Sequence, residues 1–343
     1  MAGNVLVTGG AGFIGSHVAE AFLKRGYAVT VLDDLSGGFE ENIPAGARFV
    51  RGSVVDSALV ERLFAEERYE YVFHLAAYAA EGLSHFIREF NYTNNLVGSM
   101  AVVNACIRHG VKALGFTSSI AVYGANQVPM LESTVPAPED PYGVSKYAVE
   151  LDLAAARRMF GLQSVVFRPH NVYGERQNIG DRYRNVIGIF MSQLMRGEAL
   201  TVFGDGEQQR AFSHISDVAP VMVDALLDPA CWGETFNVGA DRPYTVNELI
   251  KHIAKAFGVE PKVDYQPARD EVKVAYSSHE KIHRMVKCPE PLPLEEGIRR
   301  MAEWAKVHGP RKGGVFAHVE VRKKLPPFWE KELAEAERDA AGR

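Results

Sequence analysis

The chain has 343 residues, of which 47% are hydrophobic and 24% are charged. These fractions are typical of a globular protein and exclude a disordered, collagen-like or coiled-coil chain, while the length predicts one large domain or two lobes. The net charge of −5 is a poor match for a long polyanion such as DNA or RNA, so an anionic ligand must be met by local positive groups.

Cysteine usage and hydropathy predict a cytoplasmic protein without a metal centre. The three cysteines, Cys106, Cys231 and Cys288, lie far apart and form no CxxC pair, which argues against a disulfide framework and a zinc site. The chain enters a strand-like run at Asn4–Thr8 without a basic leader, and no apolar stretch approaches the roughly 20 residues of a membrane span. We therefore expect no membrane association.

Up to about residue 168, short apolar runs alternate with longer amphipathic segments. Strands are predicted at Asn4–Thr8, Ala28–Asp33, Arg48–Arg51, Tyr71–Leu75, Lys112–Ser118 and Gln163–Arg168, and helices at Phe13–Arg25, Ala58–Glu67, Phe90–His109 and Tyr142–Phe160. This alternation is typical of a parallel sheet that is covered by helices on both faces. The prediction is an α/β fold with a doubly wound parallel sheet.

Beyond Arg168 the alternation gives way to irregular sequence with scattered helices. Helices are expected near Val186–Arg196, Ser216–Leu227, Thr245–Phe257 and Leu294–Val307. We therefore expect residues 1–168 to form one domain and residues 169–310 a smaller, mixed lobe, with chain crossings between the two. Residues 311–343 are expected to be an appended tail that either docks on the body or frays.

A glycine-rich turn links the first strand to the first helix. Gly9, Gly12 and Gly15 are spaced GxxGxxG within Thr8–Gly15. Without a Cβ, Gly9 can form a tight turn, Gly12 lets a pyrophosphate approach the backbone, and Gly15 lets the helix pack closely on the strand. The helix N-terminus then faces the phosphates, so the spacing predicts a Rossmann-like dinucleotide site.

An acidic pair, Asp33 and Asp34, ends the second strand about 20 residues after the glycine-rich turn. A carboxylate at this point can accept hydrogen bonds from the adenine-ribose hydroxyls. Because Asp33 would repel a 2′-phosphate and no arginine follows at once, NAD is favoured over NADP as the cofactor.

Tyr142 and Lys146 stand one helical turn apart, on one face of a helix that begins after a proline. A phenol with a pKa near 10 becomes a useful base at neutral pH only if its phenolate is stabilised, which a nearby ammonium can do. Ser119 lies in a run, Thr117–Gly124, that follows a predicted strand at the edge where open α/β sheets bind ligands. The three side chains together predict proton-transfer chemistry.

The chain resembles the extended short-chain dehydrogenases/reductases, specifically the NAD-dependent nucleotide-sugar epimerase/dehydratase family, from about residue 4 to about residue 305. The motifs that carry the resemblance, in the family's order, are TGGAGFIG, LDDLSGG, HLAA (His74–Ala77), NNLVGS with Asn95, SSIAVYG, YGVSK, RPHNVYG (Arg168–Gly174) and FGDGEQQRAFSHISDVA (Phe203–Ala219). Each motif is modest alone, but eight in order exclude chance agreement.

The resemblance implies roles for the catalytic and cofactor residues. Tyr142 would remove a proton from a sugar hydroxyl, Lys146 would orient the nicotinamide ribose and lower the tyrosine pKa, and Ser119 would relay the proton. Hydride transfer to NAD would leave a 4-keto sugar. The expected cofactor-binding residues are Gly9, Gly12, Phe13, Ile14, Gly15, Asp33, Asp34, Ser53, Val54, Leu75, Ala76, Ala77, Asn95, Thr117, Tyr142, Lys146 and Pro169. Ser53 departs from the Asp that is usual in the family.

The two residues after Ser119 favour one branch of the family. The 4,6-dehydratases carry an Asp-Glu pair at these positions and the decarboxylases a Glu at the second, whereas this chain has Ile120 and Ala121. The pattern is similar to that of 4-epimerases of UDP-sugars. A dehydratase, a decarboxylase or another epimerase that uses an acid placed elsewhere stays an alternative, as does a dinucleotide sensor that has kept the fold without the reaction.

The resemblance also implies a site for the nucleotide-diphosphate sugar. Its expected residues are Ser119, Ala121, Tyr142, Asn171, Asn178, Val202, Arg210 and Arg269. Asn171, Arg210 and Arg269 match positions that contact the diphosphate, although Arg269 lies in a run that lacks the family's usual glycine. Asn178 occupies a position where uronate epimerases have an arginine, and Arg176, Arg182 and Arg184 lie close enough in sequence to keep a uronate possible.

The resemblance finally implies a homodimer that packs through the long helices at Phe90–His109 and Tyr142–Phe160. An apolar stripe on either helix fits sheet packing equally well.

Overall fold

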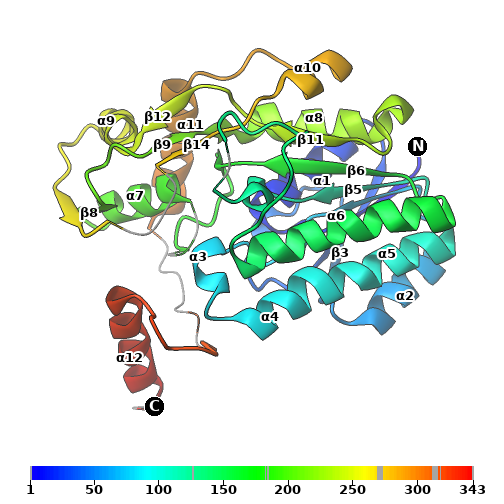
Figure 1. Ribbon diagram of the computed structural model, residues 1–343, viewed down its shortest axis with the longest axis horizontal. Coiled ribbons are helices and arrows are strands. Elements are labelled where there is room, and N and C mark those ends of the chain that lie inside the picture. The colour runs from blue at the N-terminus through cyan, green and yellow to red at the C-terminus, as the bar shows by residue number, and fades with distance from the viewer. Residues whose placement is uncertain are drawn as a thin grey trace.

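A seven-stranded sheet forms the centre of the larger lobe in the computed structural model (Figure 1), which describes residues 2–125, 127–181, 183, 185–268, 273–310, 316 and 318–341. The strand order is β11-β6-β5-β4-β1-β2-β3, and every neighbouring pair is parallel. The strands are β1 (Asn4–Thr8), β2 (Ala28–Asp33), β3 (Arg48–Arg51), β4 (Tyr71–His74), β5 (Ala113–Thr117), β6 (Ser164–Pro169) and β11 (Thr235–Val238). From β1 the chain first adds strands on one side, β2 and β3, and then on the other side, β4, β5, β6 and β11. This change of side between β1 and β4 confirms the predicted Rossmann-like doubly wound sheet.

Helices cover both faces of the sheet because successive strand residues are apolar on both sides. In β1, Val5 and Val7 pack in one buried cluster with α1 (Phe13–Lys24) and α8 (Ile215–Leu227). Leu6 points the other way, into a second cluster. The helices of that second face are α2 (Ser57–Glu66), α5 (Gly98–His109) and α6 (Pro141–Phe160).

The helix predicted at Phe90–His109 is interrupted, and further short elements surround it. The chain passes from α4 (Arg88–Tyr92) through a π-helical turn, η2 (Thr93–Val97), into α5. The other short elements of this lobe are α3 (Glu81–Ser84) and the 3-10 turns η1 (Glu40–Asn42), η3 (Ile120–Tyr123) and η4 (Pro229–Cys231).

The second lobe lies at the left of Figure 1 and has its own buried core. Its helices are α7 (Val186–Met195), α9 (Val246–Phe257) and α11 (Leu294–His308), and its strands are β8 (Leu200–Phe203), β9 (Gln209–Ala211), β12 (Pro243–Thr245), β13 (Val263–Gln266) and β14 (Val274–Ala275). The remaining elements are β7 (Val172–Tyr173), β10 (Ser213–His214), α10 (Glu280–Met285) and α12 (Pro327–Ala341). Because β11 and α8 return to the large sheet, the chain crosses between the lobes after residue 169. Among the described residues, no helix combines the length and apolarity needed to cross a bilayer.

A buried ion pair holds α6 against the sheet. Arg168, near the end of β6, donates from Nε to Oε1 of Glu150 in α6 over 3.0 Å, and from Nη1 to the hydroxyl of Tyr123 over 2.8 Å. That hydroxyl donates to Asn237 in β11, and Ser118 donates to the same Glu150 carboxylate. The network therefore connects β6, β11 and the segment that follows β5 with α6.

Removing one partner of this network should strongly destabilise the fold. We expect Arg168→Met to lower the free energy of unfolding by about 3–5 kcal/mol, because it leaves the Glu150 carboxylate buried and unpaired. Arg108→Met is the matched control, since Arg108 pairs with Glu61 at the surface and should cost less than about 1 kcal/mol. Urea denaturation of both variants tests this, and equal losses would contradict it.

Candidate active site

A large cavity runs between the carboxyl ends of the sheet strands and the second lobe. Its volume is about 2060 Å³, roughly twice the upper end for a site that holds one small ligand, so it has room for two. Of the residues predicted to bind cofactor or substrate, those that line it are Gly9, Gly12, Phe13, Ile14, Gly15, Asp33, Asp34, Ser53, Val54, Leu75, Ala76, Ala77, Thr117, Ser119, Ala121, Tyr142, Lys146, Pro169, Asn171, Asn178, Val202 and Arg210.

The glycine-rich turn leaves the start of α1 open to this cavity. Gly9 has a φ of +71°, and a Cβ on it would lie 2.7 Å from the backbone nitrogen of Ala76. A Cβ on Gly15 would lie 2.1 Å from the carbonyl oxygen of Gly9. Gly12, the N-cap, offers no side chain to the helix terminus, so the first N–H groups of α1 are left for an anion at the cavity.

Asp33 ends β2 beside this turn, and its carboxylate fixes the local backbone. Oδ2 accepts a hydrogen bond from the backbone of Ala11 over 3.0 Å, and Oδ1 accepts one from Leu35 over 2.8 Å. Burial raises the pKa of Asp33, while these backbone donors oppose the rise. The carboxylate is thus held in place with acceptor capacity to spare at the cavity.

Tyr142 and Lys146 are placed by the start of α6. Asp140 caps the helix by accepting a hydrogen bond from the backbone of Gly143 over 2.9 Å, and Pro141 occupies the first turn. Lys146, one turn on, donates from Nζ to the carbonyl of Thr117 over 2.8 Å, and Nζ lies 5.8 Å from the centre of the Tyr142 ring. The ammonium and the phenol therefore face the same end of the cavity.

Burial lowers the pKa of Lys146 to about 7, and the nearby Glu150 carboxylate only partly opposes this. A lysine with this pKa can hold or release a proton near neutral pH. Its charge, when present, stabilises a phenolate on the neighbouring Tyr142.

Ser119 completes the group at the end of β5. It is the N-cap of η3, where its Oγ accepts a hydrogen bond from the backbone of Ala121 over 3.1 Å. Both Ser119 and Ala121 line the cavity, and so does Ile120. The two residues that follow Ser119 therefore present aliphatic side chains beside Tyr142, where they can neither donate nor accept a proton.

Asn95 is not among the residues that line the cavity, and its expected contact with the cofactor stays a prediction. Its side chain is buried, its Oδ1 accepts from the backbone N–H of Tyr78 over 2.7 Å, and its Nδ2 donates to the Tyr78 carbonyl over 3.0 Å. The Asn95 amide thus fixes the loop after β4 from the buried side, away from the cavity. A motif position alone does not reveal whether a side chain faces the ligand or the wall that supports it.

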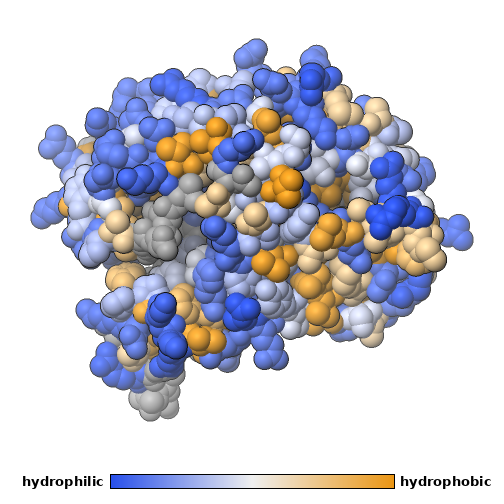
Figure 2. All heavy atoms as spheres, viewed as in Figure 1, coloured by the Kyte–Doolittle hydropathy of each residue, from blue (hydrophilic) through white to orange (hydrophobic). Residues whose placement is uncertain are grey.

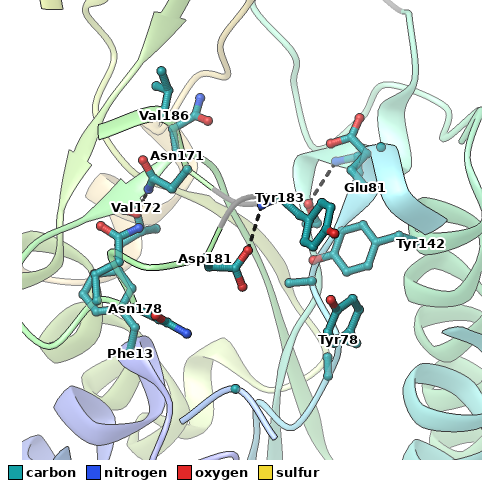
Figure 3. A pocket seen from close by; sticks show the side chains of 18 of the residues that line it. Phe13, Tyr78, Glu81, Tyr142, Asn171, Val172, Asn178, Asp181, Tyr183 and Val186 are labelled. Carbon is teal, nitrogen blue, oxygen red and sulfur yellow. Dashed lines mark hydrogen bonds between the residues drawn. The ribbon is translucent and has the colours of Figure 1, made fainter. Parts of the chain in front are cut away.

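The predicted substrate residues lie across the cavity from Tyr142. Figure 3 shows Asn171 and Asn178 on one side, Tyr142 on the other and Asp181 between them. Arg210, in β9, lines the cavity farther into the second lobe, where its Nη1 donates to the carbonyl of Gln209 over 2.8 Å. The predicted Arg269 lies outside the described residues.

Of the three arginines that keep a uronate possible, the structure describes Arg176. Arg176 pairs with Glu20 over 2.8 Å and is not among the residues that line the cavity. Arg182 and Arg184 lie outside the described residues.

Several residues that the sequence did not single out also face Tyr142. Tyr78, Glu81 and Tyr183 surround the same space (Figure 3). Tyr78 and Glu81 follow β4 closely, and their position just after the carboxyl end of a central strand was a usable signal. Tyr183 comes from an irregular loop of the second lobe, which carries no periodic signal.

Comparison with known proteins agrees with this geometry. The model of the NAD dependent epimerase/dehydratase family matches residues 5–239. A putative UDP-glucose 4-epimerase of Methanocaldococcus jannaschii is 34% identical over 306 residues, which are 88% of this chain and 98% of that protein. The dTDP-D-glucose 4,6-dehydratase of Mus musculus is 32% identical over 320 residues, which are 88% of each chain.

Among solved structures, the UDP-glucose 4-epimerase of Thermotoga maritima with UDP-glucose superposes with a TM-score of 0.84. It is 36% identical, and the superposition covers 89% of this chain and 99% of that one. The resemblance inferred from the motifs is thereby confirmed. The chain belongs to the NAD dependent epimerase/dehydratase family.

Proposed function

We propose that the protein is an NAD-dependent 4-epimerase of a nucleotide-diphosphate sugar, with a UDP-hexose such as UDP-glucose or UDP-galactose as substrate. One observation carries the choice of branch: Tyr142, Lys146 and Ser119 meet at the cavity, while Ile120 and Ala121 replace the acid pair of the dehydratases. Residues 1–168 would hold the cofactor and residues 169–310 the nucleotide sugar.

The residues of the cavity fit NAD. The turn at Gly9 and Gly15 forms a cradle that a Cβ would fill, and the first turn of α1 is uncapped. The buried Oγ1 of Thr117, at the cavity wall, has no hydrogen-bond partner among the described residues. Gly9, Gly15 and Asp33 would hold the pyrophosphate and adenosine half, and Thr117 and Lys146 would lie at the nicotinamide half.

Asp33→Asn should weaken NAD binding about 10- to 100-fold, since a hydrogen bond to a charged group contributes about 1.5–3 kcal/mol. The amide oxygen can keep one of the two hydrogen bonds from the Ala11 and Leu35 backbone groups, and the other is lost, so the melting temperature of the variant is measured as well. Calorimetric titration of NAD into the two proteins measures the change. Unchanged affinity together with an unchanged melting temperature would show that Asp33 does not bind the cofactor.

In the proposed reaction Tyr142 takes the proton of the sugar 4-hydroxyl, and Ser119 hydrogen-bonds to the same oxygen. NAD, held beside Thr117 and Lys146, would supply the acceptor for the hydride from C4 and the donor that returns it. Lys146 stabilises the phenolate form of Tyr142 that accepts this proton, and Tyr142 is a neutral phenol while it holds the proton. After the 4-keto sugar has turned its other face, Tyr142 returns the proton to the oxygen. No further acid or base is needed, which suits the aliphatic Ile120 and Ala121.

A second candidate function is a nucleotide-sugar 4,6-dehydratase, because elimination of water needs an acid or base beyond Tyr142. Glu81, in α3, lines the same cavity as Tyr142 and is a carboxylate placed elsewhere than the usual pair. Glu81→Gln separates the two functions, since it should leave epimerisation largely intact and abolish dehydration.

The direct test is incubation with UDP-glucose, UDP-galactose, their N-acetyl forms and UDP-glucuronate, followed by NMR of the products. The proposal predicts a C4 epimer of unchanged mass from at least one of these sugars. Loss of water or carbon dioxide would assign the protein to another branch.

We also propose that the protein is a cytoplasmic homodimer. Apolar side chains gather over the face formed by α4, α5 and α6 (Figure 2). The most exposed of them are Val97, Leu151, Met159 and Phe160, at 55–76%. A second copy that packs on this face would bury them. Sedimentation analysis should give the mass of two chains, and a monomer would contradict the proposal.

The three cysteines, all free thiols, support the proposed cytoplasmic location.

A further inference from the structure

One wall of the cavity comes from the far end of the chain. The C-terminal segment, meaning residue 316 and residues 318–341, ends in α12, which projects at the lower left of Figure 1. Four of its residues, Lys324, Pro326, Phe328 and Trp329, line the same cavity as Tyr142. The resemblance to the family ends near residue 305, so this wall is not supplied by any of its motifs.

Hydrogen bonds fix the C-terminal segment to the larger lobe. The Glu320 carboxylate accepts from the backbone N–H groups of Glu89 and Phe90, at the start of α4, over 2.8 Å each. The backbone N–H groups of Glu320 and Val321 both donate to the carbonyl of Phe86, over 2.8 and 3.2 Å. A carboxylate at a helix N-terminus is favoured by the helix dipole. The segment therefore docks on the body at a defined place, rather than fraying.

Apolar packing holds the part that follows. Leu325, Trp329 and Leu333 are buried in a cluster with residues of the α3–α4 region, separate from the other cores. The Trp329 ring makes edge contacts with Phe86 and Tyr183, with centroids 6.2 and 5.2 Å apart. Because Phe86 belongs to the larger lobe and Tyr183 to the loop of the second lobe, Trp329 bridges the two sides of the cavity.

The wall stands at the reacting end of the cavity. A Cβ on Gly82 would lie 3.6 Å from Cη2 of Trp329, so the indole rests on the backbone next to Glu81. Glu81 and Tyr183 surround the space in front of Tyr142 (Figure 3). The opposite end, at Arg210, is where the diphosphate is expected. Trp329 is thus placed to meet the sugar instead of the nucleotide.

We propose that the C-terminal segment is a built-in wall of the sugar subsite, in which Trp329 contacts the hexose ring and keeps the 4-keto sugar from leaving. The inference rests on the proposed function, because a 4-keto sugar that turns over within the site has to be kept from leaving while it turns. An aromatic face suits the C–H groups of a hexose and excludes water. Phe328, 52% exposed, extends the aromatic surface at the rim.

Trp329→Ala tests the wall, with Leu333→Ala as the matched control. Leu333 is 2% exposed in the same apolar cluster but does not line the cavity, so both variants lose packing and only one opens the wall. We expect Trp329→Ala to raise KM for the UDP-hexose about tenfold, equivalent to about 1.4 kcal/mol. It should also release 4-keto sugar, trapped from solution by borodeuteride. Equal changes in both variants would overturn the proposal, since they would show a purely structural role.

Fluorescence gives a second readout that needs no turnover. The chain has three tryptophans, and Trp232 and Trp304 are outside the cavity lining, so replacing both with Phe leaves Trp329 as the reporter. A UDP-hexose should change the emission and UDP alone should not. If the protein is an active epimerase and Trp329 emission does not change with a UDP-hexose, the proposed contact between Trp329 and the sugar is wrong. A responsive Trp329 in a protein that makes no epimer would instead overturn the proposed function.

Discussion

Tyr142→Phe is expected to lower kcat by about 10²–10⁴-fold, the usual contribution of a positioned acid or base. The variant keeps the ring and its packing at the start of α6 but removes the only hydroxyl that the proposed reaction uses as a base. KM for the nucleotide sugar should change little, because the lost hydroxyl acts in the transition state of proton transfer and contributes little to substrate binding.

Tyr147→Phe is the control for this variant. Tyr147 lies in the same helix, outside the cavity lining, and its hydroxyl has no part in the proposed chemistry. Initial rates with UDP-galactose measure both proteins. If Tyr142→Phe keeps more than a small fraction of the activity, or if Tyr147→Phe loses as much, the assignment of the base is wrong.

Lys146→Met should lower the enzyme activity and raise the stability of the folded protein below pH 7. Activity is expected to fall by about 10²–10³-fold, as when one preorganised charged or polar donor is removed from a reacting centre. Yet the folded protein should become more stable below pH 7. In the folded state burial lowers the pKa of Lys146 to about 7, whereas the unfolded chain titrates near the ordinary lysine value.

The sign of the effect follows from the difference between those two pKa values. The unfolded chain binds more protons between about pH 7 and pH 10, so the wild type gains stability as the pH rises through this window. Below pH 7 the cost of burying the ammonium is complete, and methionine avoids it.

Melting temperatures of the NAD-free proteins measure this difference across pH. The advantage of Lys146→Met should be largest at pH 6, at least roughly 2 °C, and should shrink toward pH 10. Lys112→Met, at an exposed lysine paired with Glu70, should show no such gain. A methionine variant that is less stable than the wild type at pH 6 would contradict the account of a strained, buried ammonium.

The first half of the fold could be predicted from local pattern, and the reason is physical. β1 and β2 have the predicted bounds because each is apolar on both faces and is bounded by turn residues. β11 was not expected, since its four residues join the sheet edge only through pairing with β6, far away in sequence. The local sequence of β6 or β11 does not indicate which distant strand it pairs with.

The site divides in the same way. Gly9, Asp33, Tyr142 and Lys146 line the cavity as predicted, because each belongs to a residue type and spacing that suits few other purposes. Trp329 could not be predicted, because its place at the cavity depends on how a distant segment packs on α3 and α4. Long-range packing, more than local chemistry, limits what the sequence discloses.

The fate of the hydrogen at C4 distinguishes C4 epimerisation from the other reactions of the family. UDP-glucose that carries deuterium at C4 is incubated with the protein, and in a parallel sample unlabelled UDP-glucose is incubated in D2O. If the same hydride returns to C4, the UDP-galactose formed in the first sample retains deuterium at C4. The UDP-galactose formed in the second sample contains no solvent deuterium on carbon. Solvent deuterium at C3 or C5, or a product that has lost water, would contradict the proposed function.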